Sequence, residues 1–249
     1  MQNLVIDIGN TRTKIAIFEK GKMVISFAID SFSKKDFDEL IADYKTIRCA
    51  IVSTVRNDSQ QLINYLKEKL EFVIELDHTT PLPIQNCYET PKTLGKDRIA
   101  AAVGANKKYP NRNILIIDAG TAITYDFVNH KNDYLGGFIT PGLNMRFKAL
   151  HQFTDKLPLL KATSPEYFQG NNTNSSIMGG VQLGLEGEID RIIHHYSSAV
   201  DELIIILTGG DTNYFEKLLK NYKFVALEIT LLGLNTILES NYIRLSENR

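Results

Sequence analysis

The apolar residues of this chain form short runs and helical stripes that alternate along the sequence. In the first half they predict strands over residues 3–9, 13–19, 22–29, 47–54 and 71–76. They predict helices over residues 33–44 and 58–70, on either side of the fourth strand. Ser33, with Asp36 three residues later, is typical of the start of a helix. Periodicity is lost over residues 77–96, where prolines indicate a loop, and a helical segment follows at 97–109.

The second half repeats this order. Three strands are predicted at 114–118, 121–128 and 133–140, and a helix begins at 141. An irregular polar stretch at 163–176 is followed by a long helix up to about 198 and a strand at 202–207. Three meandering strands followed by alternating helices and strands, twice, predict an α/β fold of two related domains. The sequence predicts the boundary near Pro110, with domains over residues 1–110 and 111–249.

A matched motif supports the duplication. Each half has a carboxylate, a glycine and a threonine after an apolar run, with one residue dropped in the second half: Asp7, Gly9, Thr11 and Asp118, Gly120, Thr121. An unpaired carboxylate is costly to bury, so it is expected where a strand opens on a cleft. Glycine lets a ligand approach the backbone. An Asx-turn that closes a hairpin is the alternative for one motif alone. The pair favours two anion-binding cradles across a cleft, each beside a carboxylate that can hold Mg²⁺, directly or through water.

A third glycine turn, Gly209-Gly210, also follows an apolar run. It could bring backbone close to the base or the ribose of a nucleotide, although a tight strand-to-helix turn requires the same residues. No Gly-x-x-x-x-Gly-Lys-Ser/Thr pattern is present, so the chain is not a P-loop enzyme.

The segment Gly95-Lys96-Asp97-Arg98 lies where a loop enters a helix. The helix dipole favours the anionic form of Asp97, and Arg98 could bind a carboxylate bidentately. These two residues suit an acceptor with a hydroxyl at one end and a carboxylate at the other. A capping aspartate and a surface arginine are the alternative.

Composition narrows the class of protein. The 249 residues have a formal net charge of -1 and a pI of about 6.5, so nucleic acid is not an expected partner. Cys49 and Cys87 have no metal-ligand spacing, which indicates a reducing compartment. The sequence shows neither a secretory leader nor an apolar run of membrane-spanning length, and we expect a cytoplasmic protein without membrane contact.

These motifs resemble the acetate and sugar kinase, heat-shock chaperone and actin superfamily. That resemblance implies two duplicated ribonuclease H-like (actin-like ATPase) domains around a cleft. Four segments together resemble the type III pantothenate kinases: DIGNTRTK at 7–14, GKDR at 95–98, DAGTAITYD at 118–126 and GGFITPGL at 136–143.

The resemblance implies ATP-dependent phosphorylation of pantothenate to 4'-phosphopantothenate, the first step of coenzyme A biosynthesis. Asp97 would be the catalytic base. The implied pantothenate-binding residues are Tyr88, Gly95, Lys96, Asp97, Arg98 and Thr173. The implied ATP-binding residues are Asp7, Ile8, Gly9, Asn10, Thr11, Arg12, Thr13, Lys14, Gly120, Thr121, Gly209 and Gly210.

The resemblance also implies two metals and a partner. Mg²⁺ would lie at Asp7, and a monovalent cation, K⁺ or NH₄⁺, at Asp118. A homodimer is expected, with Thr173 reaching the substrate of the neighbouring subunit.

Two alternatives stay open at this point. One is another small-molecule kinase of the same fold, and the other is a non-catalytic nucleotide-binding regulator. The presence of Asp7, Asp97, Arg98 and Asp118 speaks against the regulator.

Overall fold

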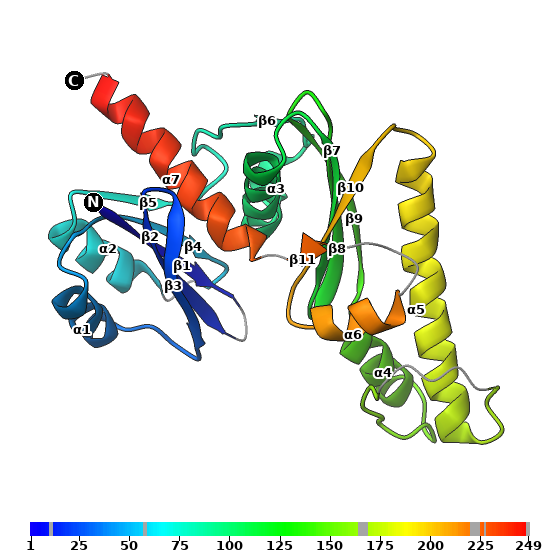
Figure 1. The fold of residues 1–249 in the computed structure, drawn as a ribbon. Helices are drawn as coiled ribbons and strands as arrows, with labels where there is room; N and C mark the ends of the chain where they lie inside the picture. The colour runs from blue at the N-terminus through cyan, green and yellow to red at the C-terminus, as the bar shows by residue number, and fades with distance from the viewer. Residues whose placement is uncertain (10–11, 57–58, 164–168, 220–224, 227, 248–249) are drawn as a thin grey trace. The chain divides into compact units, whose positions relative to one another are not determined.

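The computed structural model describes residues 1–9, 12–56, 59–163, 169–219, 225–226 and 228–247 (Figure 1). The chain divides into two compact units, each considered by itself. The first consists of residues 1–110 together with 229–249, and the second of residues 111–228.

The first unit contains a five-stranded sheet in the order β3-β2-β1-β4-β5. Its strands are β1 (Gln2–Ile8), β2 (Thr13–Glu19), β3 (Lys22–Ile29), β4 (Ile47–Thr54) and β5 (Phe72–Glu75). The first three form an antiparallel meander, and β4 and β5 continue the sheet in parallel with β1. This arrangement brings the carboxyl ends of β1 and β4 to the same edge of the sheet.

Helices cover this sheet. The remaining elements of the first unit are α1 (Lys34–Asp43), α2 (Gln60–Lys69), the short strand β6 (Gln85–Asn86), a 3-10 turn (Pro91–Thr93), α3 (Lys96–Lys108) and α7 (Ile229–Glu247). Leu4 and Ile6 of β1 form a core with Phe37 of α1 and Leu66 of α2. Ser33 and Asp36 cap α1 reciprocally, as the sequence predicted.

The last helix, α7, packs on β1, β4 and α3. Gly104 of α3 and Gly233 of α7 permit this packing, because a Cβ atom at Gly104 would lie 2.1 Å from the Ile229 carbonyl oxygen. The Asn3 side chain donates to Oδ1 of Asn235 at 2.9 Å and joins α7 to β1. The helix α7 thus packs within the first unit, whereas the sequence pattern placed these residues in the second domain. Helical periodicity does not reveal which sheet a helix covers.

The second unit has the same plan. Five strands of its six-stranded sheet follow the order β11-β10-β7-β8-β9, which corresponds strand for strand to the first sheet. They are β7 (Asn113–Ala119), β8 (Ala122–Val128), β9 (Asp133–Pro141), β10 (Leu203–Thr208) and β11 (Val225–Ala226). Again three antiparallel strands are followed by parallel ones. The duplicated α/β architecture expected from the two motifs is therefore confirmed.

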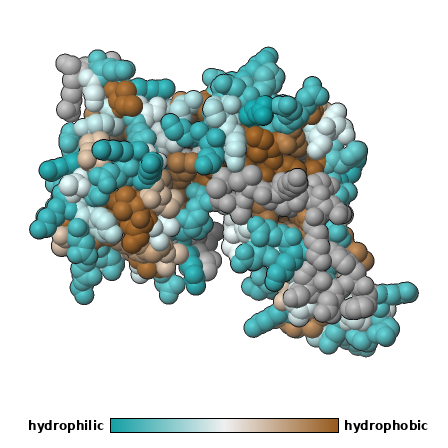
Figure 2. Space-filling model, in the orientation of Figure 1, coloured by the Kyte–Doolittle hydropathy of each residue, from teal (hydrophilic) through white to brown (hydrophobic). Residues whose placement is uncertain are grey.

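The helices of the second unit are α4 (Leu143–Gln152), α5 (Thr173–Ser197) and α6 (Thr212–Leu218). Leu115 and Ile117 of β7 pack against Phe147 of α4 and Leu185 of α5. The helix α5 begins earlier than predicted, because Asn172 and Ser175 form a capping box within the stretch expected to be irregular up to residue 176. The visible face is largely hydrophilic with separate hydrophobic patches (Figure 2). None of the helices in the described ranges has the length and apolar character of a membrane span.

Candidate active site

Asp7 is the second-last residue of the largely buried strand β1. Asp7 is in register with Lys14 on β2 and with Ser53 on β4. Burial raises the pKa of Asp7. A hydrogen bond from Ser53 opposes that rise in pKa, the nearby Asp97 carboxylate adds to it, and Lys14 opposes it. Ser53 is 2% exposed, so this hydroxyl has little access to water.

Asp7 and Asp97 therefore form a pair of interacting carboxylates within the first unit. A carboxylate whose pKa is raised by burial and by a second carboxylate marks a place that a cation would stabilise. Mg²⁺ is usually held by one or two carboxylates together with water and substrate phosphates. The donor set fits this mode of binding. The described residues contain no cluster of three or more His, Cys, Asp or Glu side chains, so a cage made of protein ligands alone is not found there.

The turn after Asp7 is tight. The Gly9 N–H donates to the Arg12 carbonyl at 3.0 Å, and a Cβ atom at Gly9 would lie 3.1 Å from the same oxygen. Ile8 and Thr13, on either side of the turn, are buried, and Arg12 is exposed. Two predicted ATP-binding residues, Asn10 and Thr11, lie outside the described residues.

The segment Gly95–Arg98 forms the start of α3, with Gly95 at the N-cap. Oδ1 of Asp97 accepts a hydrogen bond from the Arg98 N–H at 2.9 Å. A Cβ atom at Gly95 would lie 2.5 Å from this oxygen, so the glycine makes room for the carboxylate. Arg98 is 5% exposed, which disfavours its interpretation as a surface arginine. Its guanidinium lies 5.7 Å from the ring centre of Tyr88, and the two predicted substrate-binding residues are thus in contact.

In the second unit, Asp118 is the second-last residue of β7, as Asp7 is of β1. The Gly120 N–H donates to the Ala122 carbonyl at 3.1 Å, and the Gly142 N–H donates to the Thr121 carbonyl at 3.1 Å. A Cβ atom at Gly142 would lie 2.2 Å from the Gly120 carbonyl oxygen. Gly142, the last glycine of the GGFITPGL segment, therefore packs directly on the second carboxylate turn.

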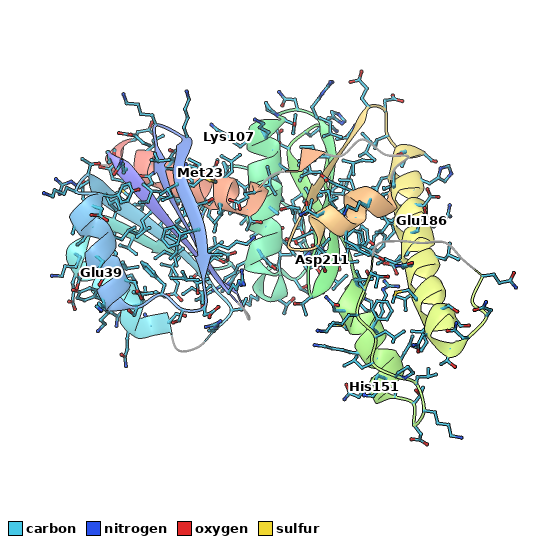
Figure 3. The ribbon with its side chains drawn as sticks, turned by 60° about the horizontal axis from the view of Figure 1, so that its bottom comes forward. Met23, Glu39, Lys107, His151, Glu186 and Asp211 are labelled. Carbon is cyan, nitrogen blue, oxygen red and sulfur yellow. The ribbon has the colours of Figure 1, made fainter. Side chains whose placement is uncertain are left out.

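The third glycine turn lies against Asp118. Gly209 has a φ of +99°, and a Cβ atom there would lie 2.5 Å from Oδ1 of Asp118 and 2.3 Å from the Ala119 carbonyl oxygen. The Asp211 N–H donates to this Ala119 carbonyl at 3.0 Å. Asp211 lies at the start of α6 (Figure 3), and burial raises the pKa of its carboxyl. Two predicted nucleotide-binding turns thus meet within the second unit.

The structure brings most predicted site residues into two groups, one in each unit. The described contacts do not join Thr173 to either group, and its side chain is exposed at the first position of α5. Three residues that contact these groups were not named as site residues from the sequence: Ser53, Gly142, and Arg56, whose Nε donates to the Gly9 carbonyl oxygen. Polar residues at the end of the apolar strand over 47–54 were the available signal for Ser53.

Substitution of Gly209 by alanine tests the second group. We expect Gly209→Ala to weaken ATP binding at least tenfold, because the new methyl group meets the Ala119 carbonyl and the positive φ strains an L side chain. Calorimetric titration with ATP measures the affinity. The control is Gly187→Ala on α5, where the added Cβ has no atom within 4 Å. Wild-type affinity in Gly209→Ala would contradict the assignment.

Two units of equal strand order, each with a carboxylate–glycine turn after its first strand, define the actin-like ATPase class of folds. The activator of the 2-hydroxyisocaproyl-CoA dehydratase from Clostridium difficile, solved with bound ADPNP, has this fold with a TM-score of 0.57. It is 13% identical to this chain, and the match covers 99% of this chain and 98% of that one.

The chain belongs to the type III pantothenate kinase family, whose pattern it matches over residues 3–195. The type III pantothenate kinase of Phocaeicola vulgatus is 43% identical over 240 residues, and that of Bacteroides fragilis is 44% identical over 239 residues. Each match covers 96% of this chain and 98% of the relative.

Proposed function

We propose that this chain phosphorylates pantothenate from ATP to give 4'-phosphopantothenate, the first step of coenzyme A biosynthesis, with Asp97 as the catalytic carboxylate. The observation that carries the assignment of Asp97 is that its carboxylate interacts with Asp7 and adjoins the buried Arg98. A carboxylate near both a metal-binding group and a carboxylate-binding group is placed to receive the proton of a hydroxyl.

Pantothenate has a hydroxyl at one end and a carboxylate at the other. Arg98 pairs with that carboxylate, and Tyr88, which already contacts the Arg98 guanidinium, lines the same site. The hydroxyl oxygen bonds to the γ-phosphorus of ATP, the bond between this phosphorus and the oxygen bridging to the β-phosphate breaks, and ADP leaves. Asp97 accepts the hydroxyl proton. A carboxylate suffices as the base, because phosphoryl transfer depends mainly on positioning and charge stabilisation.

Each unit has one glycine turn suited to a phosphate group. The turns at Gly9 and Gly120 let the phosphates approach the backbone, and Gly209-Gly210 does so for the nucleoside. Asp7 would hold Mg²⁺, directly or through water, and the metal would neutralise phosphate charge.

The monovalent cation belongs at Asp118, and K⁺ or NH₄⁺ would balance this half-buried carboxylate. A homodimer would bring the exposed Thr173 of one subunit to the acceptor of the other. Because the reaction consumes ATP, we place it in the cytoplasm.

A coupled assay of ADP release tests the proposal with pantothenate, ATP and Mg²⁺, in K⁺ and then in Na⁺. We expect turnover that requires pantothenate and is several-fold faster in K⁺. Equal rates in both salts would contradict the assignment of a monovalent cation to Asp118. Absence of pantothenate-dependent turnover in folded protein that binds ATP would refute the acceptor, and sugars would then be tested as acceptors.

A further inference from the structure

Arg56 lies outside every motif that the sequence displays, yet its side chain reaches the first phosphate-binding turn. It follows β4 and is 47 residues away from Gly9 along the chain. Its Nε donates a hydrogen bond to the Gly9 carbonyl oxygen at 2.9 Å. This bond joins the segment after β4 to the turn after β1.

The backbone of Arg56 is itself held in place. The Arg56 N–H donates to Oγ1 of Thr54 at 3.0 Å, and this oxygen lies 2.8 Å from Oγ of Ser59. Thr54 and Ser59 are 7% and 6% exposed. The neighbouring Val55 N–H donates to the Ile8 carbonyl at 3.2 Å, which joins the same segment to the end of β1. The arginine side chain therefore extends from a fixed base.

Arg56 also lines a polar cavity of about 230 Å³ together with Glu75 at the end of β5 and Lys96 at the start of α3. Lys96 belongs to the segment that supplies the catalytic carboxylate. The position of Arg56 is thus close both to the turn for the ATP phosphates and to the beginning of α3.

We propose that Arg56 is a positioning residue that holds the Gly9 carbonyl group, and with it the glycine turn after β1, in place for binding of the ATP phosphates. The proposal rests on the proposed function of that turn. A hydrogen bond to the Gly9 carbonyl restricts the backbone at a residue type that otherwise has great conformational freedom. Backbone restricted in this way loses less conformational entropy when the phosphates bind.

Two substitutions of nearly equal length separate this hydrogen bond from the charge. Nε2 of glutamine is as many bonds from Cα as Nε of arginine, so Arg56→Gln retains a donor at the required place and removes the charge. Arg56→Met has a methyl group at that place. We expect Arg56→Met to raise KM for ATP about tenfold, which corresponds to about 1.4 kcal/mol. KM for pantothenate and kcat should change less than about twofold, and Arg56→Gln should recover most of the ATP affinity.

The outcomes are distinct. An unchanged KM for ATP in Arg56→Met would overturn the proposal, and so would an equal loss in Arg56→Gln, which would assign the effect to charge. Thermal unfolding shows whether each variant is folded. Should Arg56→Met not fold, Thr54→Val is used, because it removes the hydroxyl that accepts from the Arg56 N–H. We then expect a two- to fourfold rise in KM for ATP, and no rise would overturn the proposal.

Calorimetric titration of the same full-length variants with ATP and Mg²⁺ needs no acceptor. The order wild type, Arg56→Gln, Arg56→Met in falling ATP affinity supports the positioning role even if wild-type protein does not turn over pantothenate. Absence of pantothenate turnover in the wild type would refute the proposed function but not the positioning role of Arg56.

Discussion

Asp97→Asn is expected to lower kcat by about 10²–10⁴-fold while ATP binding stays near that of the wild type. Asparagine keeps the size of the side chain, and its Oδ1 can still accept from the Arg98 N–H, so the start of α3 is preserved. What is lost is the negative charge and the ability to take a proton. Steady-state ADP release measures kcat, and calorimetric titration measures ATP affinity.

The matched control is Glu39→Gln on the exposed face of α1, which removes a carboxylate from the same unit far from any predicted site residue in sequence. It should retain wild-type kcat. A fully active Asp97→Asn enzyme would remove Asp97 from the mechanism. A comparable loss of ATP affinity would instead assign it to nucleotide binding.

Asp7→Asn is expected to abolish most of the activity and at the same time to stabilise the ligand-free protein at neutral pH. The pKa of Asp7 is raised above its ordinary value of 3.8, first by burial and also by Asp97. The folded state therefore binds this proton more tightly than the unfolded state does. The free energy of unfolding of the wild type consequently falls as the pH rises from 3.8 through the raised pKa of Asp7.

Asparagine carries no charge and can still accept from Ser53, so this fall should be absent from the variant. At pH 7 without nucleotide or metal we expect Tm to rise, by about 2–4 °C for each kcal/mol regained. Thermal unfolding between pH 4 and 8 measures the effect, and the exposed Asp30→Asn is the control. A lower Tm than that of the wild type at pH 7 would show that the ionised Asp7 stabilises the fold. We expect kcat/KM for ATP to fall at least 100-fold, because a metal ligand is lost.

The strands and their repeat could be predicted because each apolar run is long enough to identify a buried strand. The carboxylate turns could be predicted for a related reason, since a charged residue at the end of such a run is costly to bury without a partner or a ligand. Asp7 and Asp118 are therefore recognisable from the sequence alone as candidates for a binding site.

The partners of these residues could not be predicted in the same way. Ser53 reaches Asp7 through the parallel register of β1 and β4, and Arg56 reaches Gly9 through the path of the chain after β4. Both relations depend on which strands become neighbours in the sheet, and a local pattern does not contain that information. The destination of α7 was missed for the same reason, since its packing on α3 through Gly104 and Gly233 joins segments far apart in the chain.

The return of α7 to the first unit has a consequence for biosynthesis. The second unit is continuous in the chain, whereas the first is completed only by residues 229–249. On the ribosome, the strand β1, which carries Asp7, and the helix α3, which begins at Lys96, emerge long before α7, which packs on both of them. The second unit can thus fold before α7 is made, while the first acquires its full packing only when α7 has emerged. Loss of the final helix by premature termination would therefore disable the part of the enzyme that was made first.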